Sequence, residues 1–330
     1  MTTPEGEPGR LLEAPATAVR EGYRHEMGVY ASDEQFGDLM CPFALDGLEA
    51  GEPVVFAYDL HKMGLLRTWL PDVAGISYVT DMGPYSTPAR ALAAWRGVVE
   101  RHLAAGARRV RIAGDVPHPG YGRSYVGWDR YESALDRALG DLPVWAPCLY
   151  DTRIAPTEVL ETAAKRHHHF LERWGTSRVN SAYDPGERLC DFLPPPPDSL
   201  VLSPPDFELI DPTPPAVRSA VAAVAAGVVD MGRRSEDLVL AASEAVVNAL
   251  VHGRPPVTVR IWTASDRVVI DVHDEGAGPA DPLAGLLPAK APAESGRGLW
   301  LLHQLDVDVE LVATGNGFTV RLRAGSGAAA

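Results

Sequence analysis

A proline-rich segment constrains the fold of this chain more than any other feature. Between residues 192 and 215 there are nine prolines and no basic residue, in the runs Pro194–Pro197, Pro204-Pro205 and Pro212-Thr-Pro214-Pro215. Proline lacks an N–H donor and favours extended backbone, so such a stretch cannot continue one sheet or helix. We therefore predict a semi-rigid linker at 191–215 between two folding units, within which Leu200-Val-Leu202 could pack as a short strand on either neighbour.

The composition is that of a globular protein, with 46% hydrophobic and 22% charged residues, and 330 residues leave room for two domains. A net charge of −14 and a pI near 5.1 argue against nucleic acid as a direct partner. The N-terminus lacks the pattern of an export signal. The apolar stretch 220–229 is too short for a membrane span, so we expect a cytoplasmic protein without a membrane partner. The three cysteines, Cys41, Cys148 and Cys190, show neither disulfide nor zinc spacing.

Three motifs near the C-terminus follow one another in the order and spacing of a Bergerat-type ATP pocket. They are Glu244-Ala-Val-Val-Asn248-Ala-Leu-Val-His252, Asp274-Glu-Gly276-Ala-Gly278 and Gly296-Arg297-Gly298-Leu299. Helical apolar spacing places Glu244, Asn248 and His252 on one helix face. Each motif alone is more often a solvated helix face or a turn, but the series favours the ATP pocket, because Glu244 and Asn248 sit among apolar residues.

The residue types fit nucleotide chemistry. The carboxylate of Glu244 can orient or deprotonate an attacking hydroxyl, and the amide oxygen of Asn248 suits Mg²⁺. Asp274 would accept a proton from the adenine amine. Gly276 and Gly278 allow a tight backbone turn or a close approach of the backbone to a ligand. Gly296 and Gly298 would begin a helix whose N–H groups face phosphate. Arg297 would be a further hydrogen-bond donor there, next to Leu299.

Residues 216–323 resemble the ATPase domain shared by gyrase, Hsp90, histidine kinases and MutL. Within that superfamily the run Ser235–Gly253, followed by Glu-Ser-Gly296-Arg297-Gly298-Leu299-Trp-Leu-Leu, is similar to the anti-sigma-factor serine kinases. The resemblance implies ATP and Mg²⁺ as cofactors, a sigma factor as a bound partner, and a STAS-domain anti-anti-sigma protein as the phosphorylated antagonist, within a stress-response system of transcription regulation.

One departure from that family concerns adenine. The family commonly has Gly-Thr at the start of the last strand, whereas here Gly317 is followed by Phe318, with Thr319 one place later. Because successive strand residues point to opposite faces, Thr319 is a weaker candidate for the adenine site than a threonine at 318 would be.

The C-terminal unit should be a helical layer on a mixed sheet. We predict helices at 215–231 and 235–252, strands at 257–263 and 267–273, a third helix at 299–305, and strands at 307–312 and 318–323. Ser235, followed by acidic residues in the first turn, marks the start of the second helix. Gly253 marks its end. The segment 279–295 would be a mobile lid over the nucleotide, with Lys290 able to approach phosphate, although a solvated lysine is the more common role.

The N-terminal unit alternates short apolar runs with helical stretches, which indicates a largely parallel α/β sheet without a phosphate-binding loop of the G-x-x-x-x-G-K type. It resembles the MEDS sensory domain, a RecA-like module, at Arg24–Tyr30, Gly47–Glu52, Gly114-Asp115 and Ala146–Asp151. The resemblance implies reception of a small-molecule or protein signal. We expect a disordered start at 1–20, this domain at 21–190, the ATPase domain at 216–323, and a disordered tail at 324–330.

Polar residues near predicted strand ends are the candidate sensor residues, because α/β sheets bind ligands there, although any one of them is more often a packed or capped side chain. They are His25, Tyr30, His61, Asp115, Cys148, Tyr150 and Asp151. The triplet His167–His169 does not predict a metal site, since helical neighbours point to different faces. A partly exposed helix end is expected there.

The sequence thus predicts an α/β sensor joined to an ATP-dependent anti-sigma serine kinase. A histidine kinase is an alternative, but no histidine lies between His169 and His252 to accept phosphate before the ATP domain. A second alternative is a non-catalytic, nucleotide-gated sequestering module. The oligomeric state stays open, because Leu299-Trp-Leu-Leu suits either a homodimer surface or a core.

Overall fold

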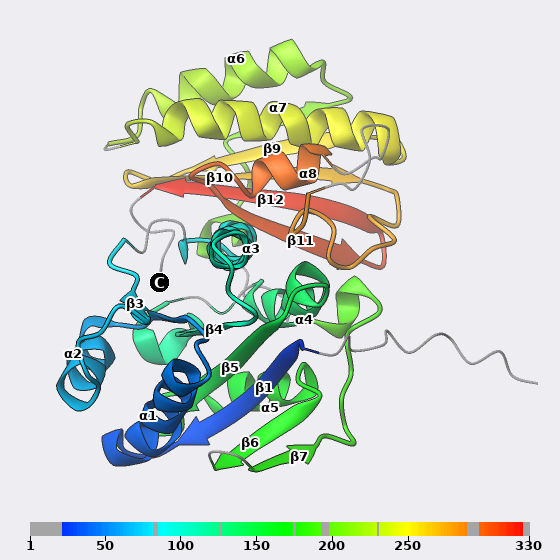
Figure 1. Ribbon diagram of the computed structural model, residues 1–330. Helices are drawn as coiled ribbons and strands as arrows, with labels where there is room; N and C mark the ends of the chain where they lie inside the picture. Colours follow the sequence, from blue (N-terminus) through cyan, green and yellow to red (C-terminus); the bar gives the residue numbers. More distant parts are fainter. Residues whose placement is uncertain are drawn as a thin grey trace, which may run out of the picture.

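The computed structural model describes residues 22–81, 85–123, 125, 127–173, 176–192, 198–229, 231–288 and 297–325. Within them the chain folds into two sheets, each with its own helices (Figure 1). The predicted disordered start at 1–20 and the proline run 194–197 lie outside the described residues. The predicted disordered tail is wrong at its beginning, because Ala324 is buried and Gly325 ends the last strand.

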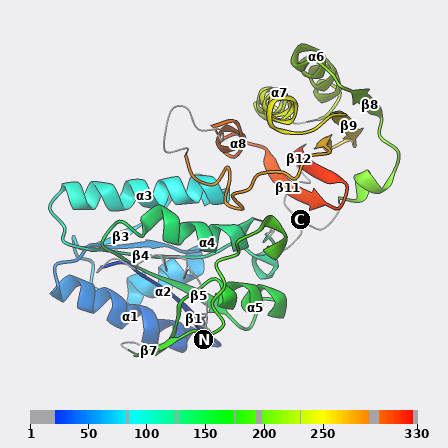
Figure 2. The same ribbon diagram turned by 90° about the vertical axis from the view of Figure 1, so that its right-hand side faces the viewer.

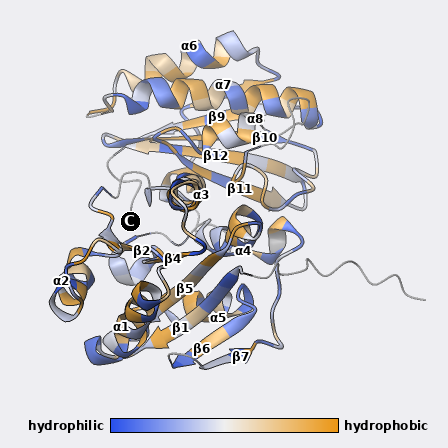
Figure 3. Cartoon of the chain, in the orientation of Figure 1, coloured by the Kyte–Doolittle hydropathy of each residue, from blue (hydrophilic) through white to orange (hydrophobic). Residues whose placement is uncertain are grey.

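The N-terminal domain is built on a seven-stranded sheet in the order β3-β2-β4-β5-β1-β6-β7. All neighbouring strands pair in parallel except β6 and β7, which confirms the predicted, largely parallel α/β class. β5 is hydrophobic along most of its length, whereas the edge strand β7 is hydrophilic (Figure 3). The strands are β1 (Arg24–Tyr30), β2 (Val54–Ala57), β3 (Ile76–Tyr78), β4 (Val110–Gly114), β5 (Val144–Asp151), β6 (His169–Arg173) and β7 (Thr176–Val179).

Helices cover both faces of this sheet. α1 and α2 pack on one face in one core cluster, and α3, α4 and α5 pack on the other face in a second cluster. Ser32, Asp59 and Thr87 accept hydrogen bonds from the first turns of α1, α2 and α3, which fixes where these helices begin. Their bounds are α1 (Asp33–Glu49), α2 (Leu60–Trp69), α3 (Pro88–Ala104), α4 (Trp128–Leu139) and α5 (Thr157–Lys165), with short 3-10 turns η2 (Pro119–Tyr121) and η3 (Leu189–Asp191).

The C-terminal domain is a five-stranded sheet in the order β11-β12-β10-β9-β8, with α6 and α7 on one face (Figure 1). All paired strands are antiparallel, so the predicted mixed sheet is wrong. β10 and β11 run in the same direction, but they do not pair with each other because β12 lies between them. The elements are η4 (Ser199–Leu202), β8 (Phe207–Ile210), α6 (Pro214–Ala225), α7 (Arg234–His252), β9 (Thr258–Thr263), β10 (Arg267–Asp274), α8 (Arg297–Leu302), β11 (Asp308–Thr314) and β12 (Gly317–Gly325).

The predicted linker contributes to the C-terminal domain. β8, which lies within 191–215, pairs with β9 at the edge of the sheet. Prolines near an edge strand are tolerated, because the N–H groups they lack are not needed for pairing on the open side. The strand lies at 207–210 rather than at Leu200–Leu202, which form a 3-10 turn. α7 begins at Arg234 without a side-chain cap, so Ser235 lies inside the helix instead of capping it.

The two domains contact each other through residues 281–287, which we call the docked segment. Its Leu283 and Leu286 are buried in the core cluster of the N-terminal domain. Arg130 of α4 donates from Nε to the carbonyl of Pro282 (2.9 Å) and from a terminal nitrogen to that of Ala284 (2.8 Å). Figure 2 shows this part of the chain descending from the C-terminal sheet toward α3 and α4. The first part of the predicted mobile lid is therefore folded against the N-terminal domain.

Burial on α7 leads to a stability prediction. Leu238 is fully buried, whereas Leu240, two residues on, is 40% exposed. Leu238→Ala should destabilise the C-terminal domain by about 2–5 kcal/mol, because it leaves a cavity, while Leu240→Ala should change stability by about 0.5 kcal/mol or less. Hydrogen exchange of the β9 and β10 amides in the full chain measures both effects. Equal effects of the two variants would contradict this packing.

Candidate functional site

The polar row on α7 faces the start of α8. Gly298 lies so close to Asn248 that a Cβ there would stand 2.7 Å from both terminal atoms of the amide. Nδ2 of Asn248 is buried and has no hydrogen-bond partner among the described residues. Glu244, one turn earlier, has no polar partner in the same part of the chain. His252 is exposed at the end of the helix. The first and third motifs are thus brought together at Asn248.

The apolar residues around this row are less buried than the sequence suggests. Ala245, Val246 and Ala249 belong to the core, but Leu250 is 46% and Val251 is 65% exposed. Glu244 and Asn248 therefore lie at the border between the core and the open surface of α7. Their position is accessible from outside, as a site for a soluble ligand requires.

Asp274 ends β10 and is held by the backbone around it. Its Oδ1 accepts hydrogen bonds from the N–H groups of Gly276 (2.7 Å) and Arg254 (3.1 Å). A Cβ at Gly276 would lie 2.6 Å from that oxygen, so the turn leaves no room for a side chain. In the described chain, the second carboxylate oxygen of this buried residue has no partner. Asp274 thus keeps one acceptor for a ligand.

Phe318 and Thr319 lie on opposite faces of the C-terminal sheet. Phe318 pairs with Asp274 across β10 and β12, and its ring occupies the place where a Cβ of Gly278 would stand. Gly278 has a φ of 75°, which favours glycine. Thr319 instead shares a hydrogen bond with His273 (2.9 Å), on the face turned away from α7. The structure therefore separates Thr319 from Asp274 and Asn248.

Lys290 and Gly296 lie outside the described residues, as does the side chain of Arg297. Leu299 is partly buried against the core of the C-terminal domain. The described part of the pocket consists of Glu244, Asn248, Asp274 and the glycines near them.

The candidate sensor residues fall into two groups. Tyr30, Asp115 and Asp151 lie at the carboxyl ends of β1, β4 and β5. Lys62, which sequence reasoning missed, joins this edge, since its Nζ contacts Asp59 and Asp115 at 2.7 Å each. Burial raises the pKa of Asp115, although Lys62 opposes the shift. His61 pairs with Asp33 at the surface instead (2.9 Å).

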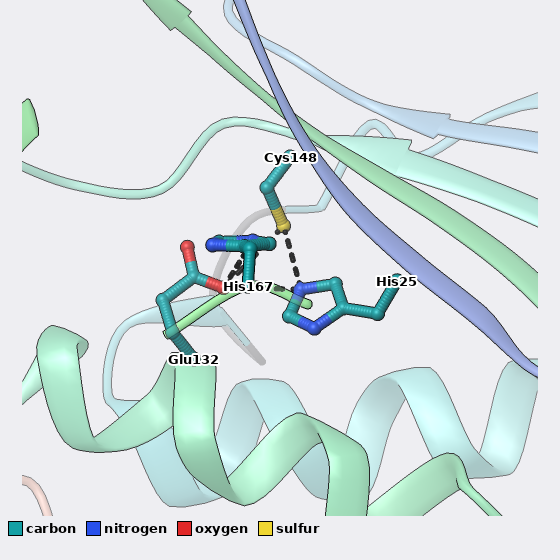
Figure 4. A group of neighbouring side chains, drawn as sticks. All are labelled: His25, Glu132, Cys148 and His167. Carbon is teal, nitrogen blue, oxygen red and sulfur yellow. Dashed lines mark hydrogen bonds and ion pairs between the residues drawn. The ribbon is translucent and has the colours of Figure 1, made fainter. Parts of the chain in front are cut away.

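The second group lies beneath the sheet, on its α4 side. His25 of β1, Cys148 of β5, Glu132 of α4 and His167 between α5 and β6 converge there (Figure 4). The oxygen Oε1 of Glu132 accepts a hydrogen bond from the hydroxyl of Tyr150, another candidate sensor residue (2.5 Å). We call the four residues His25, Glu132, Cys148 and His167 the buried cluster. All four are buried.

Burial and mutual contact set the protonation of the buried cluster. Burial raises the pKa of the Cys148 thiol to about 12. Burial and the neighbouring His25 lower the pKa of His167 to about 4. Burial alone would raise the pKa of Glu132, but His167, His25 and Tyr150 outweigh it and lower the pKa to about 2. Glu132 is therefore a buried anion held among imidazole, phenol and thiol groups.

The sequence did not predict two members of the buried cluster. His167 is fully buried beyond the end of α5, so the expected partly exposed helix end is wrong for this residue. Glu132 stands in a helix with charged residues throughout, where nothing in the pattern marks it as buried. Of the histidine triplet, only His167 joins the buried cluster. The triplet does not form the helix end expected from the sequence, because α5 ends at Lys165 and His169 begins β6, so the rule for helical neighbours does not apply.

Comparisons with known families now identify both domains. A model described as "MEDS: MEthanogen/methylotroph, DcmR Sensory domain" matches residues 24–168. A model described as "Histidine kinase-like ATPase domain" matches residues 212–324. The chain joins a MEDS domain to a histidine kinase-like ATPase domain. The predicted resemblances of both halves are confirmed at this level.

Solved structures similar to this chain include three from histidine kinases. The histidine kinase domain of the Erythrobacter litoralis EL346 blue-light activated histidine kinase has 22% identity and a TM-score of 0.21, covering 28% of this chain and 44% of that chain. A second structure of that kinase has 19% identity and a TM-score of 0.23, covering 34% and 40%. The histidine kinase domain of the E. coli osmosensor EnvZ has 19% identity and a TM-score of 0.22, covering 37% and 88%.

The chain therefore spans less than half the length of the first two of these structures. No curated protein matches the chain. Among the helices that the structure describes, none is long and apolar enough to cross a bilayer.

The contact between Asn248 and Gly298 predicts how the ATPase domain responds to a single methyl group. Gly298→Ala should force the amide to move and weaken Mg-ATP binding by about 10- to 100-fold, because small misplacements of positioned groups are costly. Gly315→Ala is the control, since a Cβ there meets no atom within 4 Å. Calorimetric titration measures both, and equal affinities would contradict the assigned position of the pocket.

Proposed function

We propose that this protein is a signal-responsive, ATP-dependent protein serine kinase that acts as an anti-sigma factor. Its ATPase domain would bind Mg-ATP, sequester a sigma factor, and phosphorylate a serine of a STAS-domain anti-anti-sigma protein. The MEDS domain would receive the signal. The serine specificity and both partners come from the resemblance of Ser235–Gly253 and Gly296–Leu299 to anti-sigma serine kinases.

One observation carries the ATP-dependent part of this proposal. Asn248 with an unpartnered amide, Gly298 with no room for a side chain, and Asp274 with a spare oxygen belong to the same domain and border its α7 face. Unsatisfied polar groups of this kind are uncommon in folded proteins unless a ligand completes them. They suit an adenine amine at Asp274 and a metal-bound phosphate chain at Asn248.

Each residue then has a separate task. The amide oxygen of Asn248 would hold Mg²⁺, which when bound neutralises phosphate charge. Gly298 lets the backbone of α8 approach that amide. Glu244 precedes Asn248 by one helical turn, and its unpaired carboxylate is free to orient or deprotonate a serine hydroxyl. His252, exposed at the helix end, completes the row and would contact phosphate.

The contact between the domains supports regulation by the MEDS domain. Arg130 is buried, and burial lowers its pKa to about 10, although Asp129 and Asp281 oppose the shift. Its two hydrogen bonds fix the docked segment on α4. The docked segment is the first part of the predicted ATP lid. A signal that moves α4 would therefore change how readily the lid closes.

A non-catalytic sequestering module is the second candidate, and Phe318 favours it. Its apolar ring stands beside Asp274, where the family commonly has a threonine. Calorimetry identifies a module that binds only its partner, because such a module gives equal heats, or none, for the native chain and Asn248→Ala. A nucleotide-gated module that binds ATP is distinguished from the kinase by the absence of phosphate transfer. Loss of heat only in the variant supports the nucleotide-dependent function.

Replacing Glu244 tests catalysis. Glu244→Ala should reduce phosphate transfer to a STAS-domain substrate by about 10²- to 10⁴-fold, the usual contribution of a positioned base, with Mg-ATP binding retained. Glu236→Ala, an exposed carboxylate on the first turn of α7, is the matched control. Radiolabelled ATP measures transfer, and acid-stable label distinguishes serine from histidine. Full transfer by Glu244→Ala would remove Glu244 from catalysis, and acid-labile label would favour the histidine kinase alternative.

Replacing Arg130 tests the control of the lid. Arg130→Ala leaves the carbonyls of Pro282 and Ala284 without their donor, so hydrogen exchange in residues 281–287 should rise. A released lid should also tighten Mg-ATP binding, by up to about 10-fold for a shift of about 1.4 kcal/mol. Arg67→Ala, on exposed α2, is the control. Unchanged exchange and unchanged affinity in Arg130→Ala would contradict regulation through this contact.

A further inference from the structure

The buried cluster unites four metal-binding side chains from four separate segments of the MEDS domain. His25 comes from β1, Glu132 from α4, Cys148 from β5, and His167 from the turn after α5. One ligand atom of each lies within 4.8 Å of those of the others. Figure 4 shows all four side chains pointing toward a common centre. Residues so distant in sequence meet only because β1 and β5 pair in parallel above α4.

Four of the six separations between these ligand atoms match a tetrahedral site. Nε2 of His25 lies 3.3 Å from Sγ of Cys148 and 3.3 Å from Oε2 of Glu132. Oε2 of Glu132 lies 3.4 Å from Sγ of Cys148 and 3.5 Å from Nε2 of His167. Four ligands at the Zn–N and Zn–S distances of about 2.0–2.3 Å would stand about 3.3–3.8 Å apart.

Neighbouring groups orient the ligands toward the centre. Nδ1 of His25 is bonded to Asp136 (3.0 Å), and Nδ1 of His167 to the carbonyl of Ala163 (2.8 Å). These partners favour a proton on Nδ1 and leave Nε2 of each ring as the ligand atom. Tyr150 holds the other oxygen of Glu132. Carboxylate or carbonyl groups behind histidine are the usual outer partners in metal sites.

His167 shows that hydrogen bonding alone does not complete the buried cluster. Its side chain is fully buried, yet Nε2 has no hydrogen-bond partner among the described residues. Hydrogen bonds within the protein satisfy both ring nitrogens of His25, which contact Asp136 and Cys148. They leave Nε2 of His167 unsatisfied, which costs free energy in a buried site. A metal ion at the centre would satisfy it.

The charges of the donors also fit a divalent ion. Two neutral imidazoles, one carboxylate and one thiolate offset two positive charges, so the bound site would be neutral, as burial favours. The Cys148 proton would pass to solvent on binding, because a coordinating thiol is deprotonated. Mixed nitrogen, sulfur and oxygen donors in a tetrahedron favour zinc over magnesium or calcium.

We propose that the buried cluster is a binding site for a thiophilic divalent transition metal, with Zn²⁺ the best match. The ion would tie β1, α4, β5 and the turn after α5 together. Because Glu132 and Arg130 are both on α4, the site lies on the helix that holds the docked segment. The proposal concerns metal binding itself and does not depend on kinase activity.

Metal titration of the purified full chain tests this proposal. After removal of bound metal with a chelator, Co²⁺ should bind at one ion per chain and give the sulfur-to-cobalt charge-transfer band and the intense visible bands of a tetrahedral site. Zn²⁺ should displace it. Elemental analysis of the untreated protein should find about one zinc ion per chain, as expected for a closed four-ligand site.

Variants identify the ligands. Cys148→Ser should abolish the charge-transfer band. His167→Gln removes a ligand and should weaken metal binding by about 100-fold or more, which is at least the largest effect usual for loss of an outer partner. Asp136→Asn should weaken it by about 10- to 100-fold. Cys41→Ser, at a half-buried thiol outside the buried cluster, should leave the spectrum unchanged. Mg-ATP binding and circular dichroism report whether each variant is folded.

Two results would overturn the proposal. One is a folded native chain that takes up neither Co²⁺ nor Zn²⁺. The other is a tetrahedral spectrum that persists in folded Cys148→Ser or that disappears in Cys41→Ser, because the ion would then be bound elsewhere. If Cys148→Ser fails to fold, the native spectrum and Asp136→Asn still decide the question.

Discussion

The burial of α4 is the constraint on which the rest of the structure depends. This helix carries charged residues along its whole length, yet Asp129, Arg130 and Glu132 are all buried. A buried charge is tolerated only when partners surround it. Glu132 meets imidazoles and Tyr150 beneath the MEDS sheet, and Arg130 meets the carbonyls of the docked segment from the ATPase domain. The same helix therefore completes the sensor core and the contact between the domains.

In the ATPase domain, the two faces of one sheet decide which residues can meet a ligand. Asp274 and Phe318 are directly paired and face α7, whereas His273 and Thr319 face away from it. Strand alternation thus excludes Thr319 from the side where Asn248 lies. The opposite face is occupied by ion pairs such as Asp271 with Arg321 (2.7 Å), which lie where no nucleotide is expected.

Much of the ATPase domain could be predicted because its order is local. Helical spacing located α6 and α7, and alternating apolar residues located β9 and β10 within a few residues. The antiparallel arrangement could not be predicted, because which strands become neighbours is decided by long-range packing. β8 was missed since prolines surround it, although an edge strand tolerates them.

Spacing along a few turns or strands was enough to predict the two-domain division, the class of each domain, and Glu244, Asn248 and Asp274 as candidate nucleotide-binding residues. The contact of the docked segment with α4 and the meeting of His25, Glu132, Cys148 and His167 emerge only in three dimensions. His25 and His167 stand near opposite ends of the matched MEDS sequence. Local patterns hold no information on such a meeting, because parallel strand order and helix burial set it.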